Sequence, residues 1–178
     1  HVRRAATALL LCSLSSASPL QAQRADSIIE RSSAAYRQLR SLTAEFDQVI
    51  SNEMIGTYTS RGTLAQAGAA RLSMRFTDPA GEAIVIDGTS IWVYTPTTAP
   101  GQVMRAPIAR AAGYGANLLA WLLDKPAERY KVTLLRGDSV AGTPVDVLRL
   151  MPAVEGLPFT SATLWLARSD GLPRRIEV

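Results

Sequence analysis

Few side chains in this chain could carry catalytic or metal-binding chemistry. The only histidine is His1 and the only cysteine is Cys12, and both fall in a segment with the features of an export leader. Ser-His-Asp and Cys-His catalysis, His/Cys zinc sites and structural disulfides are therefore not expected beyond it. The sequence also has no phosphate-binding glycine loop and no nucleophile elbow. These residues predict a protein that is not an enzyme and uses no cofactor or metal.

Carboxylates are the remaining candidates for acid–base chemistry. Asp87 and Asp170 each precede a glycine between two strand-like runs. Asp-Gly is typical of hairpin turns because glycine adopts positive φ at little cost, so we interpret both aspartates as turn residues rather than a catalytic pair. Glu45 and Asp47 share one face of a strand pattern and are expected to be solvated.

The N-terminal segment has the organisation of a secretory signal. Arg3 and Arg4 precede an apolar run too short to span a bilayer, and the possible cleavage region at 19–22 ends on the small residue Ala22. We expect a signal peptide at 1–22 and a domain at 23–178, truncated at the C-terminus because Val178 falls inside an apparent strand. Without Arg3 and Arg4, 17 basic and 15 acidic side chains remain. That balance does not fit a nucleic-acid partner, which would require a basic stripe.

Hydrophobic periodicity predicts one amphipathic helix followed by many antiparallel strands. Ser27 and Glu30 form a possible capping box, and apolar residues then recur at helical spacing, so a helix is expected over about 26–40. Residues 84–96 are rich in β-branched and aromatic residues around Asp87-Gly88, which predicts a hairpin. Further strands are expected at 42–47, 56–66, 71–77, 102–106, 129–135, 144–151, 160–167 and 173–178.

An apolar helix is expected to interrupt the strands at 114–124. Asn117 is its possible N-cap and Pro126 ends it. The leucine and tryptophan side chains of this helix project on nearly all of its sides, so it should be buried or contact lipid. The order of elements predicts a mainly β fold with helices (α+β), an unclosed and strongly curved antiparallel β-barrel with a helical lid.

One strand has a clear two-residue period. Leu72, Met74 and Phe76 alternate with polar residues that include Arg71 and Arg75. Ordinary core would explain this face, but the curved sheet and the apolar helix together exceed what one small core needs, which favours a cavity. The expected cargo-binding residues of that hydrophobic cavity are Leu72, Met74, Phe76, Ile84, Ile86, Trp92, Tyr94, Leu118, Trp121 and Leu122.

An ordered set of motifs resembles the periplasmic outer-membrane lipoprotein carrier family (LolA-type). The resemblance covers about residues 26–178. It rests on Tyr36-x-x-Leu39-x-Ser41-Leu42-x-Ala44-x-Phe46-x-Gln48, Gly62-x-Leu64, Arg71-Leu72-x-Met74-x-Phe76, Asp78-Pro79 and Ile84-Val85-Ile86-Asp87-Gly88-x-x-Ile91-Trp92-x-Tyr94-x-Pro96.

This resemblance implies a monomeric periplasmic carrier that binds the acyl chains of lipoproteins and transfers them from the inner to the outer membrane. Its implied partners are acylated lipoproteins, an inner-membrane lipoprotein release complex and an outer-membrane acceptor. The alternative is a lipid- or lipoprotein-sensing regulatory domain of the same fold, and an acyl-ester hydrolase ranks last.

One position departs from the family pattern. Gly68 occupies the place where the family often has an arginine that is implied to hold the lid shut. Arg71 is close in sequence but should point away from the cavity by strand alternation. We therefore expect a helical lid that is held less tightly than in relatives with the arginine. Gly113 and Gly115 are expected to let the lid hinge.

Overall fold

The computed structural model describes residues 19–54, 56–68, 70–108, 117–157 and 159–178. Residues 1–18 of the signal expected at 1–22 and the hinge glycines Gly113 and Gly115 lie outside these ranges, whereas residues 19–22 belong to α1. The elements in chain order are α1 (Pro19–Gln38), β1 (Ser41–Asn52), β2 (Gly56–Ala67), β3 (Arg71–Asp78), β4 (Ala80–Ile86), β5 (Ser90–Tyr94), β6 (Val103–Pro107), α3 (Leu118–Leu123), α4 (Pro126–Arg129), β7 (Tyr130–Val140), β8 (Thr143–Pro152), β9 (Ala162–Ala167) and β10 (Pro173–Glu177).

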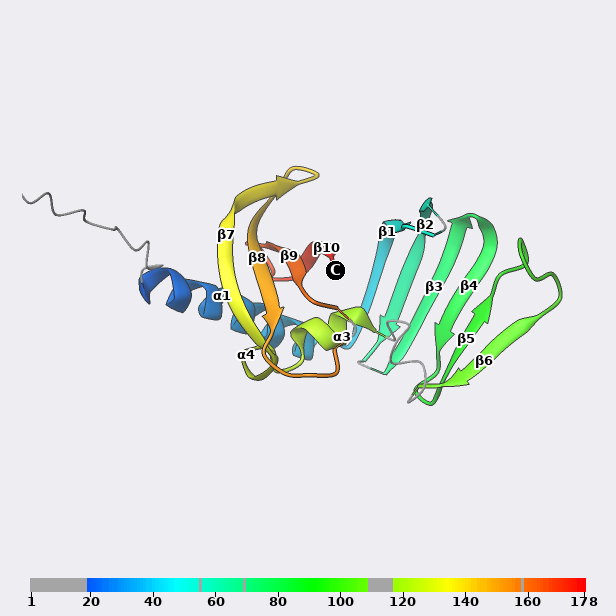
Figure 1. Cartoon of the computed structure of the whole chain (residues 1–178), viewed down its shortest axis with the longest axis horizontal. Helices are drawn as coiled ribbons and strands as arrows, with labels where there is room; N and C mark the ends of the chain where they lie inside the picture. Colours follow the sequence, from blue (N-terminus) through cyan, green and yellow to red (C-terminus); the bar gives the residue numbers. More distant parts are fainter. Residues whose placement is uncertain (1–18, 55, 69, 109–116, 158) are drawn as a thin grey trace, which may run out of the picture.

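Within the described residues the strands form two open antiparallel sheets. One sheet has the order β1-β2-β3-β4-β5-β6 and the other has the order β10-β9-β8-β7. Figure 1 shows the sheets side by side with α3 between them. Neither sheet closes on itself, which confirms the predicted open and mainly antiparallel α+β fold. The strands were expected in a single curved sheet, and the structure instead divides them into two.

Helix α1 begins earlier than the sequence predicted. It runs from Pro19 to Gln38, so Ser27 lies inside the helix and the predicted capping box is wrong. The predicted apolar stripe is confirmed, because Ile29 and Ser32 are fully buried and Tyr36 is nearly so. This stripe packs on the four-stranded sheet, where the inward residues of the strands complete the main core. That core includes Leu122, Leu123, Leu148, Leu150, Leu164 and Leu166.

An N-cap begins α3, and two hydrogen bonds anchor it to the parts of the chain around it. The Asn117 side chain caps its N-terminus by accepting from the Ala120 amide, as the sequence predicted. Ser33 in α1 donates to the Leu123 carbonyl at 2.7 Å. The Tyr130 hydroxyl donates to the Trp121 carbonyl at 2.8 Å. Helix α3 is thus attached mainly to α1 and to the start of β7.

Candidate functional site

The six-stranded sheet has one apolar face. Directly paired residues in an antiparallel sheet project to the same side, so the strand register defines its rows. One row pairs Gln66 with Leu72, Leu72 with Ile86, and Ile86 with Ile91. The next row holds Leu64, Met74, Ile84 and Val93. We call this surface the apolar face; it comprises Leu64, Leu72, Met74, Phe76, Ile84, Ile86, Ile91 and Val93, with Phe46 on β1.

Exposure differs between the rows of the apolar face. Leu72, Ile86 and Ile91 are buried and pack with Ile108. The following row is only partly buried, and at the far end Tyr58 is 41% exposed and Ile50 is 45% exposed. Helices α1, α3 and α4 lie against the four-stranded sheet or at its junction with the six-stranded sheet. None of these described helices covers the outer rows, so apolar side chains there meet solvent.

A glycine lets two aromatic rings meet across the apolar face. Gly62 of β2 lies between Phe46 of β1 and Phe76 of β3 in the register. A Cβ at Gly62 would stand 2.1 Å from the Arg75 carbonyl oxygen. Without one, the Phe46 and Phe76 rings reach each other over the middle strand in an edge-to-face contact, with centroids 5.4 Å apart. Both rings therefore remain at the surface of the apolar face.

The sequence prediction that Trp92 and Tyr94 join this face is wrong. Strand β5 alternates, and the register places Ile91 and Val93 beside the β4 isoleucines. Trp92 projects to the opposite side, where its Nε1 donates to Asp87 at 2.8 Å and Arg105 lies over its ring at 4.7 Å. Tyr94 shares the side of Trp92 by alternation, although its residue also borders the cavity described next. Alternation carried through the turn would have identified Ile91 and Val93.

A small cavity lies at the far end of the apolar face. This sheet-end cavity has a volume of about 260 Å³, and its walls include Ile50, Tyr58, Phe76, Ile84 and Val93. Desolvation raises the pKa of Tyr58 above its ordinary value, and the neighbouring carboxylates raise it further. The Tyr58 phenol therefore stays neutral across physiological pH. Glu82 and Gln48 also line the cavity, and the rest of its wall is mostly apolar.

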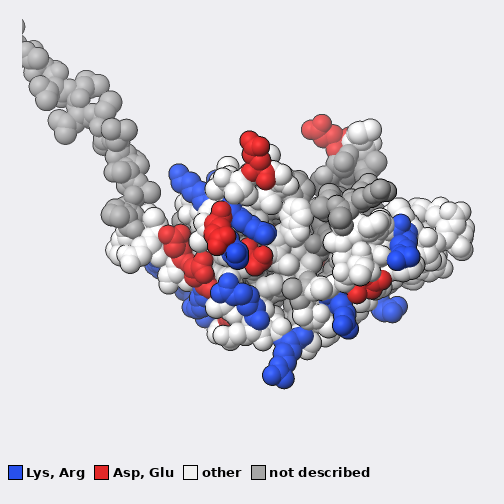
Figure 2. Space-filling view, turned by 90° about the horizontal axis from the view of Figure 1, so that it is seen from below, with Lys and Arg blue, Asp and Glu red and all other residues white. Residues whose placement is uncertain are grey.

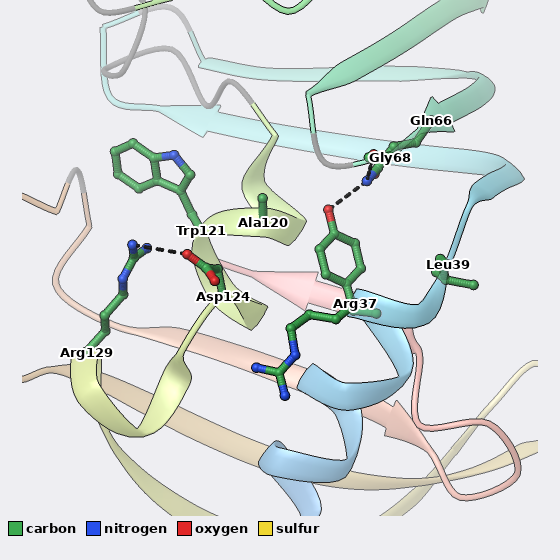
Figure 3. A pocket seen from close by; sticks show the side chains of 9 residues that line it. Arg37, Leu39, Gln66, Gly68, Ala120, Trp121, Asp124 and Arg129 are labelled. Carbon is green, nitrogen blue, oxygen red and sulfur yellow. Dashed lines mark hydrogen bonds and ion pairs between the residues drawn. The ribbon is translucent and has the colours of Figure 1, made fainter.

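A larger cavity lies where α1, β2, α3 and α4 meet. This junction cavity has a volume of about 520 Å³ (Figure 3). Trp121, Leu39 and Ala120 supply apolar wall, and Arg37, Asp124 and Arg129 supply charge. Arg129 and Asp124 approach to 3.4 Å. Gln66 also lines the junction cavity, and because it belongs to the Leu72 row, the cavity adjoins the inner end of the apolar face.

A chain of neutral hydrogen bonds connects the sheet to the helices beside the junction cavity. Gln66 Nε2 donates to the Tyr36 hydroxyl and to the Gly68 carbonyl, both at 2.7 Å. Asn117 Nδ2 donates to the same hydroxyl at 3.2 Å. We call Gln66, Tyr36 and Asn117 the polar network; Figure 3 labels Gln66 beside Gly68 at the edge of the cavity. Gly68 takes part only through its carbonyl, and its φ of +61° would strain any side chain placed there.

The structure separates the predicted helical site residues from those on the strands. Leu122 is fully buried in the main core and Leu118 packs against that core, so neither lies on the apolar face. Trp121 alone of the three lines the junction cavity. Sequence reasoning missed the polar network because Gln66 and Tyr36 are 30 positions apart. It also missed Phe46, although Gly62 between two phenylalanine-bearing strands was a usable signal.

The predicted turn aspartates serve as turn residues. Asp87 accepts from the backbone amides of Thr89 and Ser90 and from Trp92. These hydrogen bonds, that from Trp92 first, hold the pKa of Asp87 well below its ordinary value. Asp170 accepts from the Leu172 amide and lies in the other sheet. Among the described residues no group of three or more His, Cys, Asp or Glu side chains could hold a metal ion.

The surface charge is mixed. On the side seen in Figure 2, basic and acidic side chains alternate with uncharged surface, and no continuous basic stripe crosses that view. No helix in the part of the chain that the structure describes has the length and apolarity needed to cross a membrane.

The fold and site together define an open α+β protein with a partly exposed apolar face and no evident catalytic group among the described residues. The sequence matches the family model described as outer membrane lipoprotein carrier protein LolA over residues 37–178. The chain therefore belongs to the LolA family, which confirms the resemblance recognised in its motifs. A search of curated protein sequences finds no match.

Solved structures resemble this chain at low sequence identity. MucB is 21% identical with a TM-score of 0.53, and the match covers 86% of this chain and 52% of MucB. The MucA/MucB complex of Pseudomonas aeruginosa gives 20% identity and a TM-score of 0.50, covering 86% of this chain and 50% of the other. A LolA superfamily protein from Nitrosomonas europaea is 19% identical with a TM-score of 0.41, and the match covers 86% of this chain and 70% of the other. The chain thus spans about half the length of MucB.

Proposed function

We propose that the protein is a periplasmic carrier that binds the acyl chains of lipoproteins on the apolar face and transfers them from the inner to the outer membrane. The observation that carries this proposal is the row of half-buried apolar side chains that ends in the sheet-end cavity. Membership of the LolA family supports it. The partners would be acylated lipoproteins, a release complex in the inner membrane and an acceptor in the outer membrane.

The dimensions of the apolar face suit a hydrocarbon chain. Gln66 and Tyr58 mark its two ends along β2, and at about 3.3 Å per residue their separation is about 26 Å. One leaflet of a bilayer core is about 15 Å thick, so an extended acyl chain fits within this length. A chain that buries roughly 300 Å² would gain about 7 kcal/mol before the cost of association. Binding of this size needs no polar anchor and no catalytic group.

A fluorescent fatty-acid probe displaced by an acylated peptide tests the proposal. Ile50 and Val49 are adjacent and exposed, but they project to opposite faces of β1. Ile50→Asp places a charge beside the sheet-end cavity and should weaken probe binding at least tenfold. The matched control Val49→Asp should leave binding unchanged. Equal effects of the two substitutions, or no binding by the unmodified protein, would contradict the carrier proposal.

A second candidate is a sensing domain of the same fold that binds a partner protein. MucB, which has been solved in complex with MucA, favours this alternative. The same displacement assay separates the two functions when the acylated peptide is compared with its unacylated form. A carrier should bind only the acylated peptide, whereas a protein-sensing domain should bind both.

A further inference from the structure

The junction cavity combines features that the apolar face lacks. It adjoins the inner end of that face through Gln66, and its walls include the cations of Arg37 and Arg129. An acyl chain whose tail occupied the sheet-end cavity would have its polar end at this position. Resting on the proposed function, we infer that the junction cavity binds the amide-bearing polar end of an acylated peptide.

Gln66 has a buried hydrogen-bond acceptor that is not satisfied within the described part of the protein. Its orientation is fixed because Nε2 donates to the Gly68 carbonyl at 2.7 Å, and an oxygen at that position would repel the carbonyl. Its Oε1 therefore remains an acceptor, and it is buried with no hydrogen-bond partner. A buried acceptor without a donor costs free energy. An N–H group from a ligand in the cavity would satisfy Gln66 Oε1 after a small adjustment of the wall.

Two arginines, Arg37 and Arg129, line the junction cavity and can donate to a ligand. Arg37 is exposed at the end of α1 and makes no hydrogen bond or ion pair with another described residue, whereas Arg129 pairs with Asp124. Guanidinium groups donate strongly to carbonyl and phosphate oxygens. A fatty amide offers both a carbonyl to an arginine and an N–H to Gln66. The acyl ester linkages of a phospholipid offer oxygens alone, so the acceptor on Gln66 favours the amide at that position.

The test varies the ligand as well as the protein. A synthetic lipopeptide with an N-acyl amide is compared with the same lipopeptide methylated at the amide nitrogen. For the unmodified protein, methylation should weaken binding about tenfold, the effect of one lost buried hydrogen bond. In Gln66→Met the two ligands should bind equally, because no acceptor remains; a cooperative thermal melt verifies that the variant is folded.

Arg37 is tested separately with a control on the same helix. Arg37→Gln should weaken lipopeptide binding about tenfold, and Arg31→Gln, exposed on α1 away from the cavity, should have no effect. Neither should change binding of a hydrocarbon probe that carries neither an amide nor a carboxylate. Equal affinity of the unmodified protein for both lipopeptides, or equal affinity for phosphatidylglycerol vesicles, would overturn the inference and leave acyl-chain binding intact. No binding of any acyl ligand would instead refute the proposed function.

Discussion

The polar network can be tested by removing one oxygen atom. Tyr36→Phe deletes the hydroxyl that accepts from Gln66 at 2.7 Å and from Asn117 at 3.2 Å. Tyr36 is 7% exposed, so water cannot readily replace the hydroxyl. Gln66 keeps its bond to the Gly68 carbonyl but loses the second partner of its amide nitrogen. An unsatisfied buried donor costs about 1–3 kcal/mol, and we expect the free energy of unfolding to fall by about 2 kcal/mol.

Urea unfolding followed by tryptophan fluorescence measures this change. Amide exchange in α3 reports whether the loss is local, because Asn117 caps that helix, and exchange at 118–123 should accelerate. Tyr94→Phe is the matched control, since the Tyr94 hydroxyl makes no hydrogen bond with another described residue. Its effect on the free energy of unfolding should stay within about 0.5 kcal/mol. If the two variants lose the same stability, the polar network does not hold the sheet to the helices.

Three further predictions concern stability. Gly62→Ala should destabilise the fold by more than about 3 kcal/mol in chemical denaturation, because the new Cβ would stand 2.1 Å from the Arg75 carbonyl oxygen. The pKa of Asp87 is lower in the folded protein than in the unfolded chain, so its carboxylate stabilises the fold fully above the unfolded pKa of about 3.9, and this stabilisation is lost as the pH falls. The melting temperature of Asp87→Asn should therefore drop less between about pH 5 and pH 2 than that of the unmodified protein. Arg168→Met should lower the free energy of unfolding by about 3 kcal/mol, because the side chain of Asp146, which is 7% exposed, loses its ion-pair partner at 2.8 Å. Arg174→Met breaks the more exposed pair with Asp170 and should lower it by under about 1 kcal/mol.

Local patterns in the sequence predicted much of the strand content. The alternation of β3 and the Asp-Gly turns fixed strand positions within a few residues, because both depend on neighbouring residues. The division into two sheets was not predictable in the same way. It depends on which strands pair after the chain passes through α3 and α4, and no local signal specifies that pairing.

The candidate site was predicted in part. Leu72, Met74, Phe76, Ile84 and Ile86 lie together on the apolar face, as strand alternation indicated. Trp92 was assigned there with the other apolar residues of the hairpin, although its indole instead donates to Asp87 in the hairpin turn. Leu122 was assigned there because α3 is apolar on all sides, and such a helix is equally suited to a buried core.

Photo-crosslinking gives the most direct test of acyl-chain binding on the apolar face. A fatty acid with a diazirine on its chain is bound, irradiated and located by mass spectrometry of peptides. Labels are predicted on the partly buried row of β3, β4 and β5, at Met74, Ile84 and Val93. Labels on the other cluster, at Val145, Val147 and Trp165 of the four-stranded sheet, or random labelling, would contradict the assignment of the apolar face as the acyl-binding surface.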